Sequence, residues 1–308
     1  MNDDLWSIVL AGGEGVRLRP LIERWLGGHR PKQYCTFVGT RSLFQHTLDR
    51  ADLLTRPERK VVLVAAGHRK EACQQLQGRL AARVVLQPLN RDTAPGIFLP
   101  LTYVRAANPD ATVVIYPSDH FINPEERFMD FVRQATRAVE GLPEMLVLLG
   151  VLPEGVETEY GWIEPGRPVD WKGCRLRKVQ SFIEKPQRSV AEGAMARRGL
   201  WNTLVVVGKV EKLWQLGWRC FPEMMALFEM FTQAINTPKE SELLESLYSV
   251  MPSRNFSTHL LERVVEHVAV LELGDVIWSD WGRPERIPDT LRRVGKEPAF
   301  PLELLAAS

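Results

Sequence analysis

A glycine-rich segment near the amino terminus is the first place where residue types and spacing indicate chemistry. Residues 10–20 read LAGGEGVRLRP and directly follow an apolar run. Glycines let the backbone approach a phosphate closely and point N–H groups at it. Arg17 adds a planar, permanently charged group with several donors for phosphate oxygens. The pattern therefore indicates a phosphate-binding loop.

Other interpretations of the same segment must be weighed. It lacks the Gly-Lys-Ser/Thr ending of the P-loop of nucleoside triphosphatases. A dinucleotide-binding fingerprint needs a helix that starts at the loop, and Pro20 disfavours a long helix there. A glycine-rich turn with a surface arginine stays open on these residues alone.

The elements that must position this loop alternate between apolar runs and helical stretches over the first 150 residues. We expect strands at 7–10, 61–64, 112–115 and 145–149, and helices at 68–80, 93–107 and 125–140. Continuous apolar strands separated by helices predict a mainly parallel sheet covered on both faces. A loop that follows a strand of such a sheet lies at the edge where ligands usually bind.

After about residue 150 the pattern changes to strands joined by glycine- and proline-rich loops. Strands are expected at 160–164, 179–184, 204–207 and 268–273, and helices at 211–217, 221–235, 241–250 and 284–294. No repeat or long linker interrupts the chain. One continuous domain with a substrate-binding lobe fits this pattern better than two independent domains.

Composition limits the classes of partner. The chain has 308 residues, 45% of them hydrophobic and 25% charged, and a formal net charge of +1. A chain this close to neutral has no overall field for nucleic acid or an anionic membrane, so we expect neither as a partner. The start of the chain does not resemble a signal peptide, and no apolar run approaches the roughly 20 residues that span a bilayer. The four cysteines form no C-x-x-C pair, so we expect free thiols and a cytoplasmic protein.

Short segments spread along the chain match, in order, the motifs of one family. Residues 10–20 resemble L-A-G-G-x-G-x-R-L-x-P, and PKQY at 31–34 resembles P-K-Q-F. The later segments are NRDTAP (90–95), YPSDH (116–120), YGWI (160–163), FIEKP (182–186), WNT (201–203) and WSDWG (278–282). The chain therefore resembles the sugar-1-phosphate nucleotidylyltransferases, and its 90–95 segment is similar to that of the mannose-1-phosphate guanylyltransferases.

The resemblance implies a fold and a reaction. The fold is a Rossmann-like, mainly parallel α/β sheet with helices on both faces and a smaller sugar-binding lobe. The nucleotidyltransferase domain is expected at 1–297, with the nucleotide-binding part to about 150, the sugar-binding part at about 151–297, and a tail at 298–308. The reaction joins a nucleoside triphosphate, GTP by this likeness, to a sugar 1-phosphate, mannose 1-phosphate, and releases pyrophosphate. A homodimer stays open.

By the same resemblance, five charged residues carry catalysis: Arg17, Lys32, Asp119, Lys185 and Asp280. Arg17 and Lys32 would contact the nucleotide phosphates, and Lys185 the sugar phosphate. Asp119 and Asp280 would bind Mg²⁺, a hard cation that needs few carboxylates because phosphates and water supply its other ligands. Plainer alternatives are a solvated loop lysine for Lys32, an exposed charge at a turn for Lys185, and a turn or N-cap aspartate for Asp280. We expect both carboxylates to face solvent and ligand.

Further residues are implied for the two substrates. The expected nucleotide-binding residues are Leu10, Ala11, Gly12, Gly13, Gln87, Asn90, Thr93, Ala94 and Pro95. The expected sugar-binding residues are Gly161, Glu184 and Asn202, with Glu184 accepting bonds from sugar hydroxyls. We do not assign His120 as a general base, because a sugar phosphate is already an anionic nucleophile.

Several positions depart from the family pattern. Gln87 stands where many guanylyltransferases have Glu, Asn255 replaces an Asp, and residues 203–205 read TLV in place of S-G-M. These changes leave the identity of the base and of the sugar open. Another base or hexose, or a catalytically silent homologue that senses a nucleotide sugar, is the alternative function.

Overall fold

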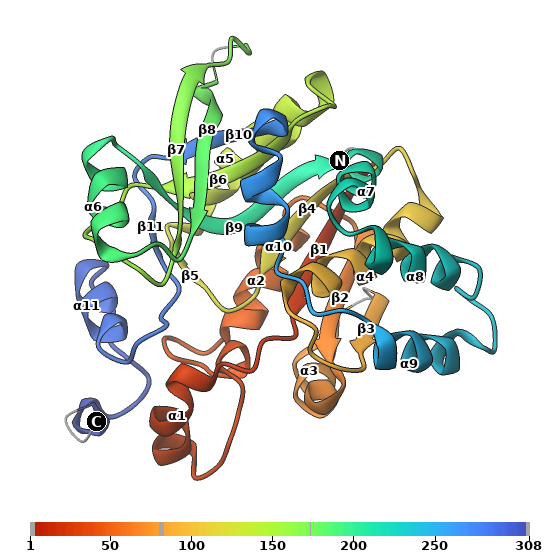
Figure 1. Cartoon of the computed structure of the whole chain (residues 1–308). Coiled ribbons are helices and arrows are strands. Elements are labelled where there is room, and N and C mark those ends of the chain that lie inside the picture. Colours follow the sequence, from red (N-terminus) through yellow and green to blue (C-terminus); the bar gives the residue numbers. More distant parts are fainter. Residues whose placement is uncertain (1–3, 80–82, 173, 306–308) are drawn as a thin grey trace.

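A single large sheet with helices on both sides organises the computed structural model, which describes residues 4–79, 83–172 and 174–305 (Figure 1). The described residues form a nine-stranded sheet of order β3-β2-β1-β4-β9-β6-β10-β8-β7 and a two-stranded sheet of β11 and β5. Leu80 at the end of one expected helix, residues 1–3 of the expected domain and residues 306–308 of the expected tail lie outside the described residues.

The first part of the sheet is parallel. Its strands are β1 (Leu5–Ala11), β2 (Lys60–Ala65), β3 (Arg83–Gln87) and β4 (Thr112–Pro117), and β1 pairs in parallel with both β2 and β4. Their residues are nearly all apolar because helices bury both faces of the strands. The carboxyl ends of β1 and β4 therefore open at one edge, where the glycine-rich loop begins.

The second part of the sheet is mixed. Its strands are β6 (Leu146–Val151), β7 (Gly161–Pro168), β8 (Leu176–Glu184), β9 (Leu200–Lys209) and β10 (Val268–Leu273). Strand β9 pairs antiparallel with both β4 and β6 and so joins the two parts, whereas β10 pairs in parallel with β6. The α/β class with helices on both faces is confirmed, and the antiparallel strands gather in the half that carries the expected sugar residues.

Helices cover the two faces of the sheet with separate cores. They are α1 (Arg19–Leu26), α2 (Leu43–Asp52), α3 (Arg69–Gln75), α4 (Thr93–Ala107), α5 (Glu125–Gly141), α6 (Arg188–Ala196), α7 (Val210–Cys220), α8 (Pro222–Thr232), α9 (Glu240–Val250), α10 (Phe256–His259) and α11 (Arg286–Arg293). Along β2, Val61 and Leu63 pack toward the core that includes α4, α7 and α8. Val62 and Val64 pack toward the core that includes α2 and α5. This alternation follows from the two-residue period of a strand.

A third, smaller core holds the loops at the ligand edge. It contains Leu18 and Ile22 from the start of α1, Phe121 from β5 (Phe121–Asn123), Trp281 after β11 (Ile277–Ser279), and Leu291 from α11. The rings of Phe121 and Trp281 stack with their centroids 4.5 Å apart. Arg17, Asp119 and Asp280 each lie within two residues of a member of this core, so packing holds their backbones in place.

Two helices are short. Pro20 occupies the first turn of the eight-residue α1, where its missing N–H is no loss, and the absence of a long helix there agrees with the expectation from this proline. The helix expected at 68–80 is a short α3 that ends at Gln75. Over residues 4–79, 83–172 and 174–305, no helix combines the length and apolarity needed to cross a bilayer.

Candidate active site

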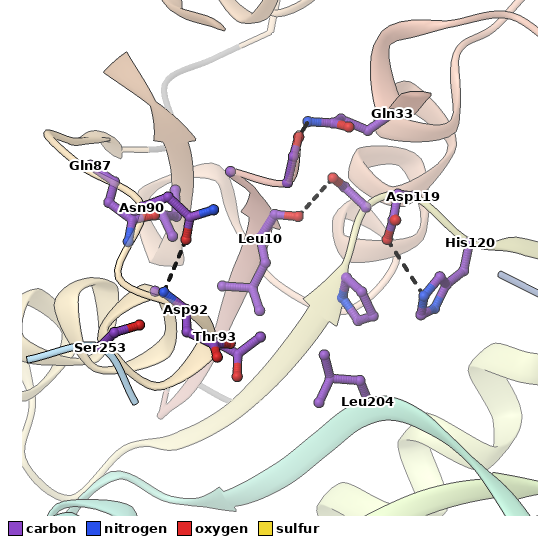
Figure 2. A pocket seen from close by; sticks show the side chains of 16 residues that line it. Leu10, Gln33, Gln87, Asn90, Asp92, Thr93, Asp119, His120, Leu204 and Ser253 are labelled. Atoms are coloured by element: carbon purple, nitrogen blue, oxygen red, sulfur yellow. Dashed lines mark hydrogen bonds and ion pairs between the residues drawn. The ribbon is translucent and has the colours of Figure 1, made fainter. Parts of the chain in front are cut away.

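Most of the residues predicted to bind the nucleotide line one cavity at the carboxyl ends of the parallel strands (Figure 2). The cavity has a volume of about 680 Å³. Its lining includes the predicted residues Leu10, Gly12, Gly13, Gln87, Asn90, Thr93 and Asp119. Ala11 is buried in β1, and Ala94 and Pro95 are buried in the first turn of α4, so these three predicted residues lie behind the wall rather than in it.

Side chains from other elements hold the glycine-rich loop open. Gln33 donates from Nε2 to the carbonyl oxygens of Ala11 (3.1 Å) and Gly13 (2.8 Å), and Ser118 donates from Oγ to Leu10 O at 2.7 Å (Figure 2). These bonds occupy the carbonyl side of the loop. Among the described residues, no acceptor takes up the backbone N–H groups of Gly12 and Gly13. Unpaired N–H groups of this kind suit phosphate binding.

Gln87 lies at the opposite wall, at the end of β3. Its side chain is buried beside Tyr248, whose hydroxyl donates to Pro95 O at 3.2 Å. A Cβ on Gly12 would lie 3.1 Å from Gln87 Oε1, so the glycine lets this acceptor stand against the loop. Asn90 accepts from Asp92 N at 2.9 Å, which shapes the turn that begins α4.

Lys32 links the two predicted metal-binding aspartates. Its Nζ lies 2.9 Å from Asp119 Oδ2 and donates to the backbone carbonyl of Asp280 at 2.5 Å. The lysine side chain is only 5% exposed, which excludes the solvated loop lysine. Burial opposes ionisation of Asp119, but the Lys32 ammonium, together with smaller contributions from His120 and a backbone hydrogen bond, holds the pKa of this carboxyl well below its usual range.

The two-stranded sheet explains why Asp119 and Asp280 meet. Strand β5 pairs antiparallel with β11 so that Phe121 lies opposite Ser279. Asp119 comes two residues before Phe121, and Asp280 comes directly after Ser279, so antiparallel pairing brings both to the same end of the ribbon. Asp119 and Asp280 are far apart in the sequence, yet in the fold both contact Lys32.

Asp280 is more enclosed than the sequence suggested. Its Oδ1 accepts from Tyr160 OH (2.5 Å), Gly282 N (2.8 Å) and Arg286 Nη1 (2.9 Å), and its Oδ2 accepts from Arg17 Nη2 (3.0 Å). The side chain is 10% exposed, so the expectation that it faces solvent is wrong. The bond to Gly282 N supports the turn alternative for part of its role, whereas the N-cap of α11 is Glu285. Asp119, with a side chain 36% exposed, does reach the cavity.

His120 is held neutral beside these charges. Burial lowers the pKa of this histidine, and Asp119 offsets that effect only in part. Trp278 donates from Nε1 to His120 Nδ1 at 3.3 Å, which leaves Nε2 as the protonated nitrogen. The ring packs edge-on against Trp278 with centroids 5.0 Å apart. Because Nδ1 accepts from Trp278 and Nε2 carries the proton, the ring has no free lone pair, which agrees with leaving His120 without a general-base role.

The three predicted sugar residues converge next to this group. A Cβ on Gly161 would lie 2.7 Å from Glu184 Oε2 and 3.4 Å from Asn202 Cβ, so the glycine lets β7, β8 and β9 bring the two polar side chains together. Asn202 Oδ1 accepts from Leu204 N at 3.1 Å, which leaves its amide donors available. Lys185 is exposed, with φ of 47°, and its N–H donates to Tyr160 O at 3.1 Å.

Comparison with known proteins identifies the family to which this arrangement belongs. A family profile described as "Nucleotidyl transferase" matches residues 6–296. The chain belongs to the nucleotidyl transferase family. It is 28% identical over 285 residues to a mannose-1-phosphate guanylyltransferase of Escherichia coli, covering 90% of this chain and 58% of that protein. It is 34% identical over 203 residues to the mannose-1-phosphate guanylyltransferase RfbM of Salmonella typhimurium, covering 64% of this chain and 40% of that protein.

A solved structure supports the same assignment to the nucleotidyl transferase family. It is a crystal structure described as a mannose-1-phosphate geranyltransferase from Thermus thermophilus, with a TM-score of 0.79 and 26% identity. The match covers 96% of this chain and 80% of that one. The chain spans 58% or less of the length of the two guanylyltransferases. The resemblance recognised from the sequence is confirmed at the level of the family.

Within this nucleotidyl transferase site, the sequence missed several residues that the fold brings in. Tyr160 and Arg286 hold Asp280, and Leu204 lines the nucleotide cavity from a bulge in β9 with φ of 56°. A positive φ is unusual for a branched side chain and marks local strain. Tyr160 carried a signal as part of the YGWI segment, and Leu204 carried one because residues 203–205 read TLV in place of S-G-M. The contacts of Arg286 and the bulge itself depend on long-range packing.

Proposed function

We propose that the chain transfers a nucleotidyl group from GTP to mannose 1-phosphate, giving GDP-mannose and pyrophosphate. The observation that carries the proposal is that one cluster of charged side chains connects the cavity to the predicted sugar-binding residues. Lys32 joins Asp119, in the wall of the nucleotide cavity, to Asp280, and Tyr160 joins Asp280 to the backbone of Lys185 beside the sugar residues. Two anionic substrates would therefore meet where cationic groups converge.

The residues have distinct parts in the proposed reaction. A phosphate oxygen of the sugar 1-phosphate forms a bond to the α-phosphorus, and the bond from that phosphorus to the bridging oxygen breaks as pyrophosphate leaves. Arg17 and Lys32 neutralise the triphosphate, and Lys185 neutralises the sugar phosphate. Glu184 and Asn202 orient the sugar hydroxyls, and Gln87 faces the base. Positioning and charge neutralisation carry most of the catalysis in such transfers.

The donor groups fit a magnesium ion. Carboxylate oxygens of Asp119 and Asp280 are the ligands that Mg²⁺ prefers, and phosphate oxygens and water complete its shell. No group of three or more His, Cys, Asp or Glu side chains gathers in the described part of the chain, so protein ligands alone would hold the ion weakly. The family generally depends on a divalent metal. A bound cation would supply charge stabilisation at the α-phosphate.

A panel of substrates tests the proposal. Pyrophosphate release is measured for GTP, ATP, UTP, CTP and dTTP, each combined with the 1-phosphates of mannose, glucose and galactose. The expected result is the highest kcat/KM for GTP with mannose 1-phosphate. A higher value for another pair identifies a different base or hexose, and binding without release for every pair favours a sensing homologue. The division near residue 150, the cytoplasmic location and a homodimer stay predictions.

A further inference from the structure

Arg286, the first residue of α11, stands in a tight set of contacts although no proposed substrate role uses it. Its guanidinium donates from Nη1 to Asp280 Oδ1 at 2.9 Å and to the Tyr160 hydroxyl, and from Nη2 to Glu157 Oε2. The same guanidinium carbon lies 4.9 Å from the centroid of the Tyr160 ring. Three groups from two other segments thus fix one arginine.

Its anchor, Glu157, is itself rigid. Glu157 Oε1 accepts from Thr158 N and Glu159 N, each at 3.0 Å, and the side chain is 13% exposed. A carboxylate that is held by backbone N–H groups and faces an arginine fork is a fixed point rather than a mobile surface charge. Arg286 therefore fixes the position of the Asp280 carboxylate relative to the loop before β7, to which Glu157 belongs.

The two carboxylate oxygens of Asp280 therefore have different hydrogen-bond partners. Arg286, Tyr160 and Gly282 N all bind Oδ1, whereas Oδ2 faces Arg17 alone among the described hydrogen-bond donors. Arg17 is about half exposed and is the residue proposed to bind phosphate. If a triphosphate draws Arg17 away, Oδ2 is the carboxylate oxygen that loses its hydrogen-bond donor, whereas Oδ1 keeps its three donors.

We propose that Arg286 is a positioning residue that holds Asp280 Oδ1 so that Oδ2 is presented to the divalent cation accompanying the triphosphate. The inference rests on the proposed metal role of Asp280 and deepens it. A lysine could not replace the arginine fully, because only the guanidinium fork reaches Glu157 and Asp280 together.

Whether the loss of the Arg286 side chain raises or lowers the affinity for the cation distinguishes a positioning role from a purely electrostatic effect. Removing a positive charge near a cation site should strengthen cation binding by electrostatics alone. Losing an outer partner that orients a metal ligand should instead weaken binding, by about 10-fold to 100-fold. Arg283 provides the matched control, because it carries the same charge and lies 3.8 Å from Glu157, whereas the described side chains that bind Asp280 do not include it.

The experiment measures Mn²⁺ binding by electron paramagnetic resonance of free Mn²⁺, with the full chain saturated by GTP. We expect Arg286→Gln to weaken Mn²⁺ binding at least about 10-fold, Arg286→Lys to give an intermediate value, and Arg283→Gln to equal the wild type or bind slightly tighter. GTP binding without metal should change less than about twofold, and thermal unfolding confirms that each variant is folded.

Several results would overturn the inference. One is unchanged or tighter Mn²⁺ binding by folded Arg286→Gln, another is an equal loss in Arg283→Gln, and a third is no Mn²⁺ binding by the wild type with GTP. The measurement needs no turnover. Failure of the proposed reaction, seen as no pyrophosphate release from any substrate pair, is therefore recorded separately from failure of the positioning role.

Discussion

The buried Lys32 and the partly exposed Asp119 form an ion pair, with Nζ 2.9 Å from Oδ2, and Asp119 lines the cavity. The lysine also donates to the Asp280 carbonyl, so a single ammonium group bridges the segments that flank β5 and β11. In the proposed reaction, this pair would lie next to the α-phosphate and its cation. The first experiments therefore concern the charge of the carboxylates.

We expect Asp119→Asn and Asp280→Asn each to lower kcat by at least about 100-fold, comparable to the loss of one strong transition-state contact. An amide keeps the size of the carboxylate but removes a charged ligand. Steady-state pyrophosphate release measures the effect, and excess Mg²⁺ should restore part of it if metal affinity is the cause. Asp130→Asn, an exposed aspartate on α5, is the control.

The two variants should differ in stability. Asp280 is enclosed by four hydrogen-bond donors, so Asp280→Asn should also lower the free energy of unfolding by about 1–3 kcal/mol, whereas Asp119→Asn should cost less. Denaturant unfolding measures both. Near-wild-type turnover by Asp280→Asn would return Asp280 to a structural role in its turn and would remove it from the metal site.

Lys185→Ala should raise the KM for the sugar 1-phosphate by about 10-fold or more while changing the KM for the nucleotide little, because a charged hydrogen bond to one substrate is lost. Lys172→Ala is a close control: Lys172 is also an exposed lysine with positive φ on the sugar side of the sheet. Equal increases in both KM values, or an equal effect of Lys172→Ala, would contradict a role for Lys185 at the sugar phosphate.

Gln87→Glu should sharpen the preference for guanine. Guanine offers N1–H and an exocyclic amine as donors, and a charged acceptor binds donors more strongly than an amide oxygen does. We expect the ratio of kcat/KM for GTP over UTP to rise about 10-fold. Gln180→Glu, an exposed position on β8, controls for added charge. A preference of the wild type for UTP or dTTP would contradict the assignment to guanine.

The pH dependence of sugar binding should report Glu184. Burial raises the pKa of this carboxyl, and Lys185 lowers it only in part. A protonated Glu184 is a poorer acceptor for sugar hydroxyls, so the KM for the sugar 1-phosphate should rise as pH falls through this raised pKa, above the ordinary range near about 4.3. Glu184→Gln should show no such rise. A wild-type KM that stays flat down to about pH 4.5 would argue against the role.

Stability should change with pH in the opposite sense. Because the folded chain holds the Glu184 proton more tightly than the unfolded chain does, this group makes the free energy of unfolding fall as pH rises from the ordinary glutamate range through the raised pKa. Glu184→Gln removes that fall. The difference in unfolding free energy between variant and wild type should therefore shrink as pH decreases, which denaturant titrations at several pH values measure.

Much of the fold could be predicted because its elements have strong periodic signals. Helix α4 and strand β10 have the bounds expected from the sequence. In each, a run of apolar residues identifies the element and turn residues mark its ends. Helices α1, α2, α6 and α10, strand β3 and the β5–β11 ribbon were not predicted. Strand β3 has only five residues, and β5 and β11 have three each, so tertiary pairing rather than local propensity decides them.

The site was harder to predict than the fold. The loop residues and Gln87 line the cavity because their motif lies at strand ends, which a parallel sheet collects at one edge. The enclosure of Asp280 could not be foreseen, because Arg17 and Tyr160 reach it from two distant segments and Arg286 from the start of α11. Ala94 and Pro95 match the family motif yet serve the first turn of α4. A motif identifies a segment, and packing decides which of its side chains meet a ligand.

The third core has a consequence for when the site can form during synthesis. It combines Leu18 and Phe37 near the start of the chain with Phe121, Trp281 and Leu291, and the ring of Phe300 packs 5.3 Å from that of Trp25. Contacts of such long sequence separation form slowly and late. The parallel strands β1 to β4 can pair while the ribosome is still working, and Lys32 is by then available to Asp119. Trp281 and Leu291, which complete the third core, and Asp280, the partner of Arg17, leave the exit tunnel much later. A nascent chain would thus hold the first part of its sheet before the core around the candidate site is complete.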